Sequence, residues 1–219
     1  MVTLDASEDL QRFVDSGVVA VMRGADADTV IDVADALAAG GITAFEVTAD
    51  NPDAMELIAE VSASFSESEA IVGAGTVLDS ETARAAITNG AEFVVSPTFE
   101  SDVVTTCNRY GTLVAPGAMT PTEALEAYEA GADLVKVFPA ASLGPSHLSS
   151  IAGPLPQVPL MPTGGIDADN VADYIEAGAV VVGAGSAIMD EEAIARGDFE
   201  AITETAREFT RVIDEARGE

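Results

Sequence analysis

The single lysine of the chain, Lys136, has the setting of a carbonyl nucleophile. It lies in the apolar run LVKVF, where period-two alternation places Leu134 and Phe138 on the same face of a strand as Lys136. Burial disfavours the charged form of an amine, and a neutral amine condenses with a ketone to form a Schiff base. The alternative is a lysine whose stem packs on the strand while its head reaches solvent. Because lysine occurs at no other position, we expect a catalytic role instead of a surface role.

Glu46 is the candidate proton-transfer group. It lies in the sequence FEVT, at the end of a strand-like run, between the apolar residues Phe45 and Val47. Apolar surroundings raise the pKa of a carboxyl group, which lets it exchange protons near neutral pH. The alternative is an ordinary solvated carboxylate, since the chain has 38 acidic residues.

Glycine-rich segments in the second half of the chain are typical of a phosphate site. They are PTGGI at 162–166 and GAGS at 183–186. Glycine lets backbone N–H groups approach an anion, and the start of a following helix adds partial positive charge. A third segment, GAGTV at 73–77, offers the hydroxyl of Thr76. Glycine that merely turns the chain is the alternative for each segment.

Residue counts exclude several classes of function. One cysteine, Cys107, cannot form an internal disulfide, and one histidine, His147, leaves no second imidazole for a histidine-based zinc site. The net charge of −29 makes nucleic acids and anionic membranes poor partners. No stretch is long and apolar enough to span a membrane, and the first residues lack the pattern of a secretion signal. We therefore expect a cytoplasmic protein.

The acidic residues are dispersed over the expected helices and are not gathered in one tail. There are 38 acidic residues against 9 basic ones, of which 8 are arginine. Such a surface is typical of a halophilic protein, because molar salt screens the repulsion between carboxylates to within about 3 Å. An ordinary acidic enzyme of a low-salt cell is the alternative.

These residues must be positioned by a regular alternation of short strands and helices. Strand-like runs are predicted at 18–22, 42–48, 70–73, 92–96, 112–115, 133–138, 158–161 and 179–183. Helices are predicted at 27–39, 52–64, 80–89, 101–110, 120–130, 145–151, 168–177 and about 198–216. Glycine follows several of these helices, as in AAGG, TNGA and EAGA, where it supplies a left-handed helix end.

Eight alternating units predict an α/β fold, a single-domain (β/α)8 TIM barrel over residues 1–219, with an N-terminal lead-in segment and a C-terminal helix. A flavodoxin-like sheet would use only five strands, so we prefer the barrel. In such a barrel the chemistry lies at the carboxyl ends of the strands. The candidate site residues found there include Arg23, Glu46, Thr76, Pro97, Lys136, Phe138, Thr163, Gly164, Gly165, Gly185 and Ser186.

Taken together, the motifs at these strand ends resemble one family. In chain order they are VMRG at 21–24, EVT at 46–48, GAGTV at 73–77, SP at 96–97, PG at 116–117, KVFPA at 136–140, GP at 144–145 and PTGGI at 162–166. The set resembles the class I aldolases that cleave 2-keto-3-deoxy-6-phosphogluconate (KDPG) and 4-hydroxy-2-oxoglutarate. The resemblance extends over about residues 15–190.

The resemblance implies a metal-independent lyase of the Entner–Doudoroff pathway, with no cofactor, that works as a homotrimer. It implies that Lys136 forms the Schiff base with pyruvate or the keto acid, and that Glu46 is the general acid and base. Thr76 would bind the pyruvyl carboxylate, and Pro97 and Phe138 would line the pocket. The phosphorylated end of the substrate would be held by Thr163, Gly164, Gly165, Gly185 and Ser186.

One position departs from the family pattern. Many members carry an arginine in the turn after EVT that pairs with the pyruvate carboxylate, but this sequence has Asp50 there. Arg23, at the end of the first expected strand, can supply the missing cation. We therefore expect Arg23 to bind the carboxylate.

Other activities remain open at this point. The main substrate could be the galactonate epimer of KDPG, or unphosphorylated 4-hydroxy-2-oxoglutarate. A lone lysine beside a phosphate site would also suit a pyridoxal-phosphate protein. A barrel that only binds phosphosugars is the non-enzymatic alternative, because a fold does not fix a function.

Overall fold

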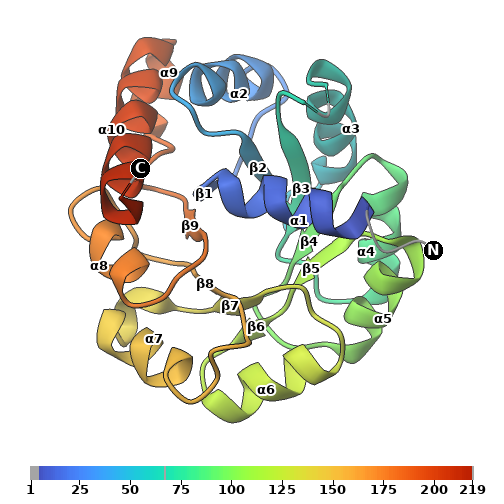
Figure 1. Ribbon diagram of the computed structural model, residues 1–219. Coiled ribbons are helices and arrows are strands. Elements are labelled where there is room, and N and C mark those ends of the chain that lie inside the picture. The colour runs from blue at the N-terminus through green and yellow to red at the C-terminus, as the bar shows by residue number, and fades with distance from the viewer. Residues whose placement is uncertain (1–4, 67, 219) are drawn as a thin grey trace.

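Parallel strands alternate with helices along the chain in the computed structural model, which describes residues 5–66 and 68–218 (Figure 1). The strands are β1 Val18–Met22, β2 Ala44–Thr48, β3 Ile71–Gly75, β4 Phe93–Val95, β5 Leu113–Ala115, β6 Gly117–Ala118, β7 Val135–Val137, β8 Leu160–Pro162 and β9 Val182–Ala184. The α-helices are α1 Asp5–Asp15, α2 Val30–Ala39, α3 Ala54–Ser64, α4 Ser80–Thr88, α5 Ser101–Tyr110, α6 Pro121–Glu129, α7 Pro145–Ala152, α8 Val171–Glu176, α9 Glu191–Arg196 and α10 Phe199–Arg217. A short 3₁₀ helix, η1, covers Ala140–Ser142.

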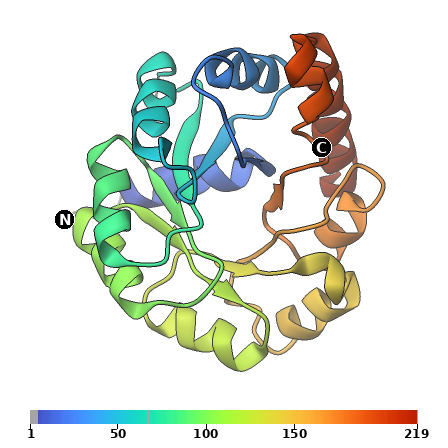
Figure 2. The ribbon, with the colours of Figure 1, turned by 180° about the vertical axis from the view of Figure 1, so that it is seen from behind.

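The strands form two parallel sheets. The larger sheet has six strands in the order β5-β4-β3-β2-β1-β9, and the smaller has three in the order β6-β7-β8. Every recorded strand pair is parallel, as expected when each strand is followed by a helical crossover. The predicted α/β class is confirmed, and from both sides α2 to α8 and α10 are seen to surround the strands (Figures 1 and 2).

Individual backbone contacts connect the two sheets at both ends. Leu160 of β8 forms a parallel bridge with Ala179, before β9, and Thr163, after β8, forms one with Gly183 of β9. At the other junction, the carbonyl oxygen of Val114 in β5 accepts hydrogen bonds from the backbone N–H groups of Asp133 and Leu134, just before β7, at 3.1 and 3.4 Å. The two sheets therefore adjoin one another at two places.

Buried apolar residues form two clusters on opposite faces of the strands. The larger cluster joins one face of the strands to the helices and includes Val135 and Val137 of β7. The smaller cluster includes Leu134, on the opposite face. Its other members come from strands throughout the chain and from α1: Phe13, Val19, Ala44, Ile71, Phe93, Val95, Leu113, Ala115, Met161 and Val181. This division matches the period-two alternation predicted for the run around Lys136.

The N-terminal lead-in segment is a helix, which the sequence analysis did not predict. In α1, apolar residues recur at Leu10, Phe13 and Val14, the spacing of one helical face. Phe13 is 1% exposed, and its ring packs edge-on against Phe93, the first residue of β4, with centroids 4.8 Å apart. Helix α1 thus lies across the amino ends of the strands (Figure 1). The short helix α9 was also not predicted.

The predicted glycines at helix ends have the expected backbone geometry. Gly41, Gly90, Gly131 and Gly178 all have positive φ angles, between 95° and 106°. Each follows a helix and allows the chain to turn into the next strand within a few residues. Among the described residues, no helix has the length and apolar composition needed to cross a membrane.

Candidate active site

Lys136 is the central residue of β7 and is 5% exposed. Its neighbours Val135 and Val137 pack toward the helices, so the lysine side chain lies on the inner face with Leu134. Its Nζ lies 4.9 Å from the centre of the Phe138 ring, and Phe138 is itself 38% exposed. The lysine is therefore shielded from bulk water while its amine lies next to an aromatic ring at the strand end. Burial of Lys136 was predicted from the sequence.

Glu46 is the central residue of β2 and is 1% exposed. Burial raises the pKa of its carboxyl group, while the charges of Lys136 and Arg23 lower it and the charge of Asp50 raises it. Its Oε2 has no hydrogen-bond partner within the described residues. A buried carboxyl with a raised pKa and an unused oxygen is suited to accept and release protons. The sequence analysis predicted both the burial and the direction of this pKa change.

Gly75 makes room for this carboxyl group. It ends β3, directly opposite Thr48 in the parallel pairing with β2. A Cβ atom at Gly75 would overlap the Glu46 carboxyl group, so any side chain there would displace it. The sequence analysis treated Gly75 only as part of a glycine turn and did not predict this role. The contact joins two strands, and local sequence carries no signal for it.

Arg23, Asp50 and Thr76 form a polar group at the ends of β1, β2 and β3. Nη1 of Arg23 forms an ion pair with Oδ2 of Asp50, and Nη2 donates a hydrogen bond of 3.0 Å to Oγ1 of Thr76. Thr76 has a φ of 57°, the only positive φ of a non-glycine residue in the described part of the chain. This conformation is unfavourable for a β-branched residue, so contacts around Thr76 must hold it in place. The pairing of Arg23 with Asp50 was not predicted.

The predicted phosphate-binding residues follow β8 and β9. Thr163 is 6% exposed, and its Oγ1 has no hydrogen-bond partner among the described residues. Gly164 and Gly165 have φ angles of 97° and 74°. No hydrogen bond within 5–66 and 68–218 is recorded from the backbone N–H of Gly164, Gly165, Gly185 or Ser186. These N–H groups offer donors for an anion without adding a basic side chain.

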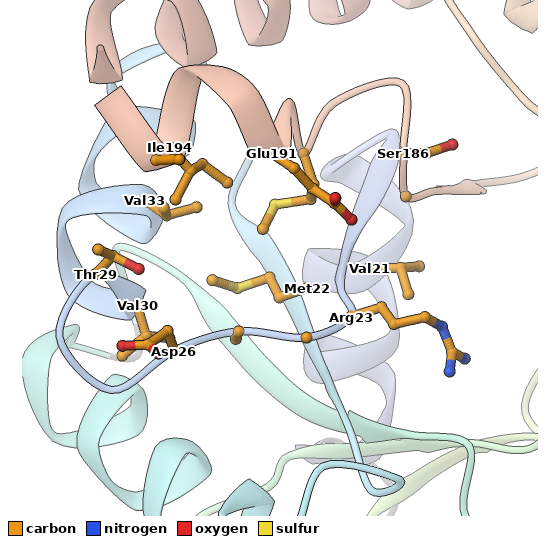
Figure 3. A pocket seen from close by; sticks show the side chains of 15 residues that line it. Val21, Met22, Arg23, Asp26, Thr29, Val30, Val33, Ser186, Glu191 and Ile194 are labelled. Atoms are coloured by element: carbon orange, nitrogen blue, oxygen red, sulfur yellow. The ribbon is translucent and has the colours of Figure 1, made fainter. Parts of the chain in front are cut away.

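A cavity of about 610 Å³ lies beside this region, between α2 and α9 (Figure 3). Arg23, Gly185 and Ser186 are among its lining residues, whereas Lys136 and Glu46 are not. In Figure 3 the side chain of Arg23 extends away from the apolar wall that includes Met22 and Val33. This cavity therefore adjoins the residues at the strand ends without containing the lysine.

Two further residues with chemically reactive side chains, His147 and Cys107, have surroundings that suit a structural role. Nε2 of His147, in α7, hydrogen-bonds the carbonyl oxygen of Met119 at 2.6 Å. Cys107 is buried in α5, and burial raises the pKa of its thiol to about 12. A thiol with so high a pKa is a poor nucleophile at neutral pH.

Four buried side-chain oxygens lack hydrogen-bond partners among the described residues, and all lie within or next to strands. They belong to Glu46, Thr48, Ser96 and Thr163. Thr48 and Ser96 belong to the strand-end motifs EVT and SP, but no role was predicted for either residue. An unsatisfied buried oxygen in a native protein calls for an explanation such as a bound water or ligand. Thr48 ends β2, while Ser96 and Thr163 directly follow β4 and β8, so these three lie at carboxyl ends of strands like the other candidate site residues.

Comparisons with known proteins agree with this chemistry. The family model described as "KDPG and KHG aldolase" matches residues 11–205. The chain is 37% identical to the 2-dehydro-3-deoxy-phosphogluconate aldolase of Treponema pallidum, over 94% of this chain and 96% of that protein. It is 32% identical to the 2-dehydro-3-deoxy-6-phosphogalactonate aldolase of Escherichia coli, over 77% of this chain and 82% of that protein.

A solved structure gives a similar result. The KDPG aldolase of Legionella pneumophila, with pyruvate captured as a covalent carbinolamine intermediate, superposes with a TM-score of 0.84 at 31% identity. The match covers 91% of this chain and 96% of that one. The similarity thus includes nearly all of both chains.

Proposed function

Because the chain belongs to the KDPG and KHG aldolase family, we propose that it cleaves KDPG to pyruvate and glyceraldehyde 3-phosphate. The enzyme is a class I aldolase, a lyase that acts through a Schiff base and requires no metal. The observation that carries the proposal is the burial of Lys136 and Glu46 on the strands of one parallel α/β fold, with the lysine charge acting on the carboxyl group. A nucleophilic amine and a group able to move protons are what this reaction needs.

The reaction begins when the Lys136 amine, after losing its proton, attacks the C2 carbonyl of the keto acid. The carbinolamine that forms loses water, with Glu46 supplying and removing protons, and leaves an iminium ion. A base then removes the proton of the C4 hydroxyl, the C3–C4 bond breaks, and its electron pair flows into the iminium. Glyceraldehyde 3-phosphate leaves, the enamine takes a proton at C3, and water releases pyruvate and the free amine.

The remaining site residues have proposed roles in substrate binding. Arg23 and Thr76 bind the carboxylate of the keto acid, and Pro97 and Phe138 line the space around the reacting carbons. Arg23 in this role takes the place of the family arginine that is absent at Asp50. The free backbone N–H groups described above support a phosphate site made by Thr163, Gly164, Gly165, Gly185 and Ser186.

We propose that the two sheets form one closed eight-stranded barrel, with residues 1–219 as a single domain. The bridges between the β8 and β9 segments, and the hydrogen bonds from Asp133 and Leu134 to Val114 of β5, support closure at both junctions. In this arrangement β5 and β6 act as one bent strand, since only Pro116 separates them. The inner apolar cluster fits the filled interior of such a barrel.

We also propose that the enzyme is a cytoplasmic homotrimer, as the family resemblance implies. Light scattering coupled to size-exclusion chromatography tests this proposal. A trimer gives three times the chain mass of 22.3 kDa, whereas a species of one chain mass contradicts it.

Borohydride reduction in the presence of pyruvate tests the catalytic proposal. Because Lys136 is the only lysine, we expect one pyruvate-sized adduct, located on Lys136 by peptide mass spectrometry and absent from Lys136→Met. Parallel assays measure pyruvate release from KDPG, from its galactonate epimer and from 4-hydroxy-2-oxoglutarate. No adduct on the folded wild-type protein would contradict the proposal and favour a phosphosugar-binding protein. A visible chromophore in the purified protein would favour pyridoxal phosphate.

A further inference from the structure

Asp50 pairs with the guanidinium group of Arg23, which is the group that would bind a substrate carboxylate. One terminal nitrogen of the guanidinium pairs with Asp50, and the other donates to Thr76. A guanidinium binds a carboxylate best through two parallel N–H···O bonds. While Asp50 is in place, the edge formed by the two terminal nitrogens is not available to a second carboxylate.

The ion pair is accessible to solvent and can exchange its carboxylate. The side chain of Arg23 is 59% exposed and that of Asp50 is 45% exposed. Exposed ion pairs contribute about 0–1 kcal/mol, so an incoming anion can displace Asp50 at little cost. This makes Asp50 a competitor of moderate strength and not a permanent block.

The backbone around Asp50 is held firmly while its side chain is at the surface. The N–H of Ala49 donates to the carbonyl oxygen of Gly75 at 2.7 Å, and the N–H of Asn51 donates to that of Thr48 at 3.1 Å. The side-chain amide of Asn51 donates to the carbonyl oxygen of Ala25 at 2.8 Å. The turn is thus tied to the ends of β2 and β3 and to the segment after β1. Only rotation of the Asp50 side chain is needed to release Arg23.

No other arginine in the described residues follows a strand directly, so none can replace Arg23 at this end. The remaining arginines all lie within helices: Arg12, Arg84, Arg109, Arg196, Arg207, Arg211 and Arg217. The substrate carboxylate and Asp50 therefore depend on the same guanidinium.

We propose that Asp50 is an internal competitor of the substrate carboxylate, which holds Arg23 in the free enzyme and is displaced when the keto acid binds. Asp50 then raises the KM for keto acids, because each binding event breaks one ion pair as it forms another. This inference rests on the proposed function, since it takes a keto-acid carboxylate as the ligand of Arg23 and Thr76.

The test compares Asp50→Asn with the matched control Asp53→Asn. Asp53 is exposed, lies three positions further along the chain, and its side chain makes no capping hydrogen bond at the start of α3. Both variants remove one negative charge, but only Asp50 contacts Arg23. We expect Asp50→Asn to lower the KM for KDPG about two- to fivefold, with a smaller change in kcat. The pyruvate concentration that gives half-maximal borohydride trapping should fall by the same factor, whereas Asp53→Asn should change both values much less.

Repeating both substitutions in an Arg23→Ala background isolates the contact. Without the guanidinium, Asp50→Asn and Asp53→Asn should have equal effects on the pyruvate concentration for half-maximal trapping and on KM. The comparison is not made on kcat, because the charge of Asp50 also acts on the pKa of Glu46. A rise in KM for Asp50→Asn would overturn the inference, because Asp50 would then position Arg23 for the substrate. Equal effects in the wild-type background, or a difference that persists without Arg23, would also overturn it. Absence of both cleavage and trapping in the wild type would instead contradict the proposed function itself.

Discussion

At the scale of single residues, Glu46 holds its proton more tightly in the folded protein than in the unfolded chain. Burial raises its pKa above the ordinary value of 4.5, even though Lys136 and Arg23 act in the opposite direction. The folded state therefore binds more protons than the unfolded state between the ordinary and the raised pKa. Stability due to this group is fully present below the ordinary pKa and is lost as the pH rises through the raised one. The carboxyl group of Glu46, the proposed proton-transfer group, therefore lowers the stability of the fold at neutral pH.

This cost predicts the behaviour of Glu46→Gln. The amide has nearly the same shape and stays neutral, so the variant should be more stable than the wild type at pH 7–8. Thermal melts at constant salt should show a Tm higher by about 2–4 °C per kcal/mol. The difference should vanish as the pH falls below the ordinary pKa of the carboxyl group.

The control for this prediction is Glu56→Gln, on the exposed side of α3. It removes the same charge from the surface and should leave the pH dependence of the Tm unchanged. A Glu46→Gln protein that is less stable than the wild type at pH 8 would contradict the prediction. Equal differences at pH 4 and pH 8 would contradict it as well.

The burial of Lys136 and Glu46 could be predicted from the sequence, whereas the ion pair between Arg23 and Asp50 could not. Lys136 and Glu46 interrupt apolar runs, and burial of such residues follows from the alternation of a strand. The ion pair of Arg23 and Asp50 joins residues 27 positions apart, on neighbouring strand ends. Such a contact depends on strand order and on side-chain geometry, which local patterns do not contain.

At the scale of elements, α1 closes the amino end of the strands. Phe13 brings α1 into the inner cluster, where it meets the first residues of β2, β3 and β4. Arg12 of the same helix donates to the carbonyl oxygen of Ala70 at 3.1 Å and pairs with Glu92 at 3.2 Å. The helix therefore holds the segments before β3 and β4 in place at the amino ends of the strands. The candidate site residues lie at the opposite, carboxyl ends.

Phe13→Ala should therefore lower the free energy of unfolding while leaving the catalytic constants of the folded protein unchanged. Removal of a buried phenylalanine costs about 3–5 kcal/mol, and denaturant unfolding should show a loss of this size. At 25 °C, kcat and KM of the folded fraction should stay close to the wild-type values, because Lys136 lies near the other end of the strands. Gln11→Ala, an exposed change in the same helix, should alter stability by less than about 0.5 kcal/mol. A large fall in kcat at full folding would contradict this division between the two ends.

The elements that the sequence predicted are those with a strong local signal. β1 and α5 have the predicted bounds, and the predicted helix-ending glycines have positive φ. β3 extends to Gly75, two residues past the predicted end at 73, because pairing with β2 continues through the glycines. The helices α1 and α9 were missed. Helix α9 has six residues, too few for a clear apolar period.

At the scale of the whole molecule, the excess of acidic residues is the dominant feature. With 9 basic residues for 38 acidic ones, most carboxylates can have no basic partner. The helical surfaces therefore carry carboxylates that repel one another over the screening distance. That distance is about 10 Å in 0.1 M salt and about 3 Å in 1 M salt. Folding brings these charges close together. Screening by salt therefore stabilises the folded protein more than the unfolded chain.

We therefore propose that the enzyme is halophilic, and expect its stability to depend steeply on salt. The Tm measured by circular dichroism should be about 10 °C or more higher in 2 M than in 0.1 M sodium chloride, corresponding to about 3–5 kcal/mol. Sucrose, an osmolyte without charge, should not restore the lost stability at low salt to the same degree, because it provides no screening. Protonation of the carboxylates near pH 4 should reduce the salt dependence, since it removes the repelling charges. A Tm that is equal at both salt concentrations would mean that the acidic surface is neutral for folding, and would contradict the halophilic proposal while leaving the catalytic one intact.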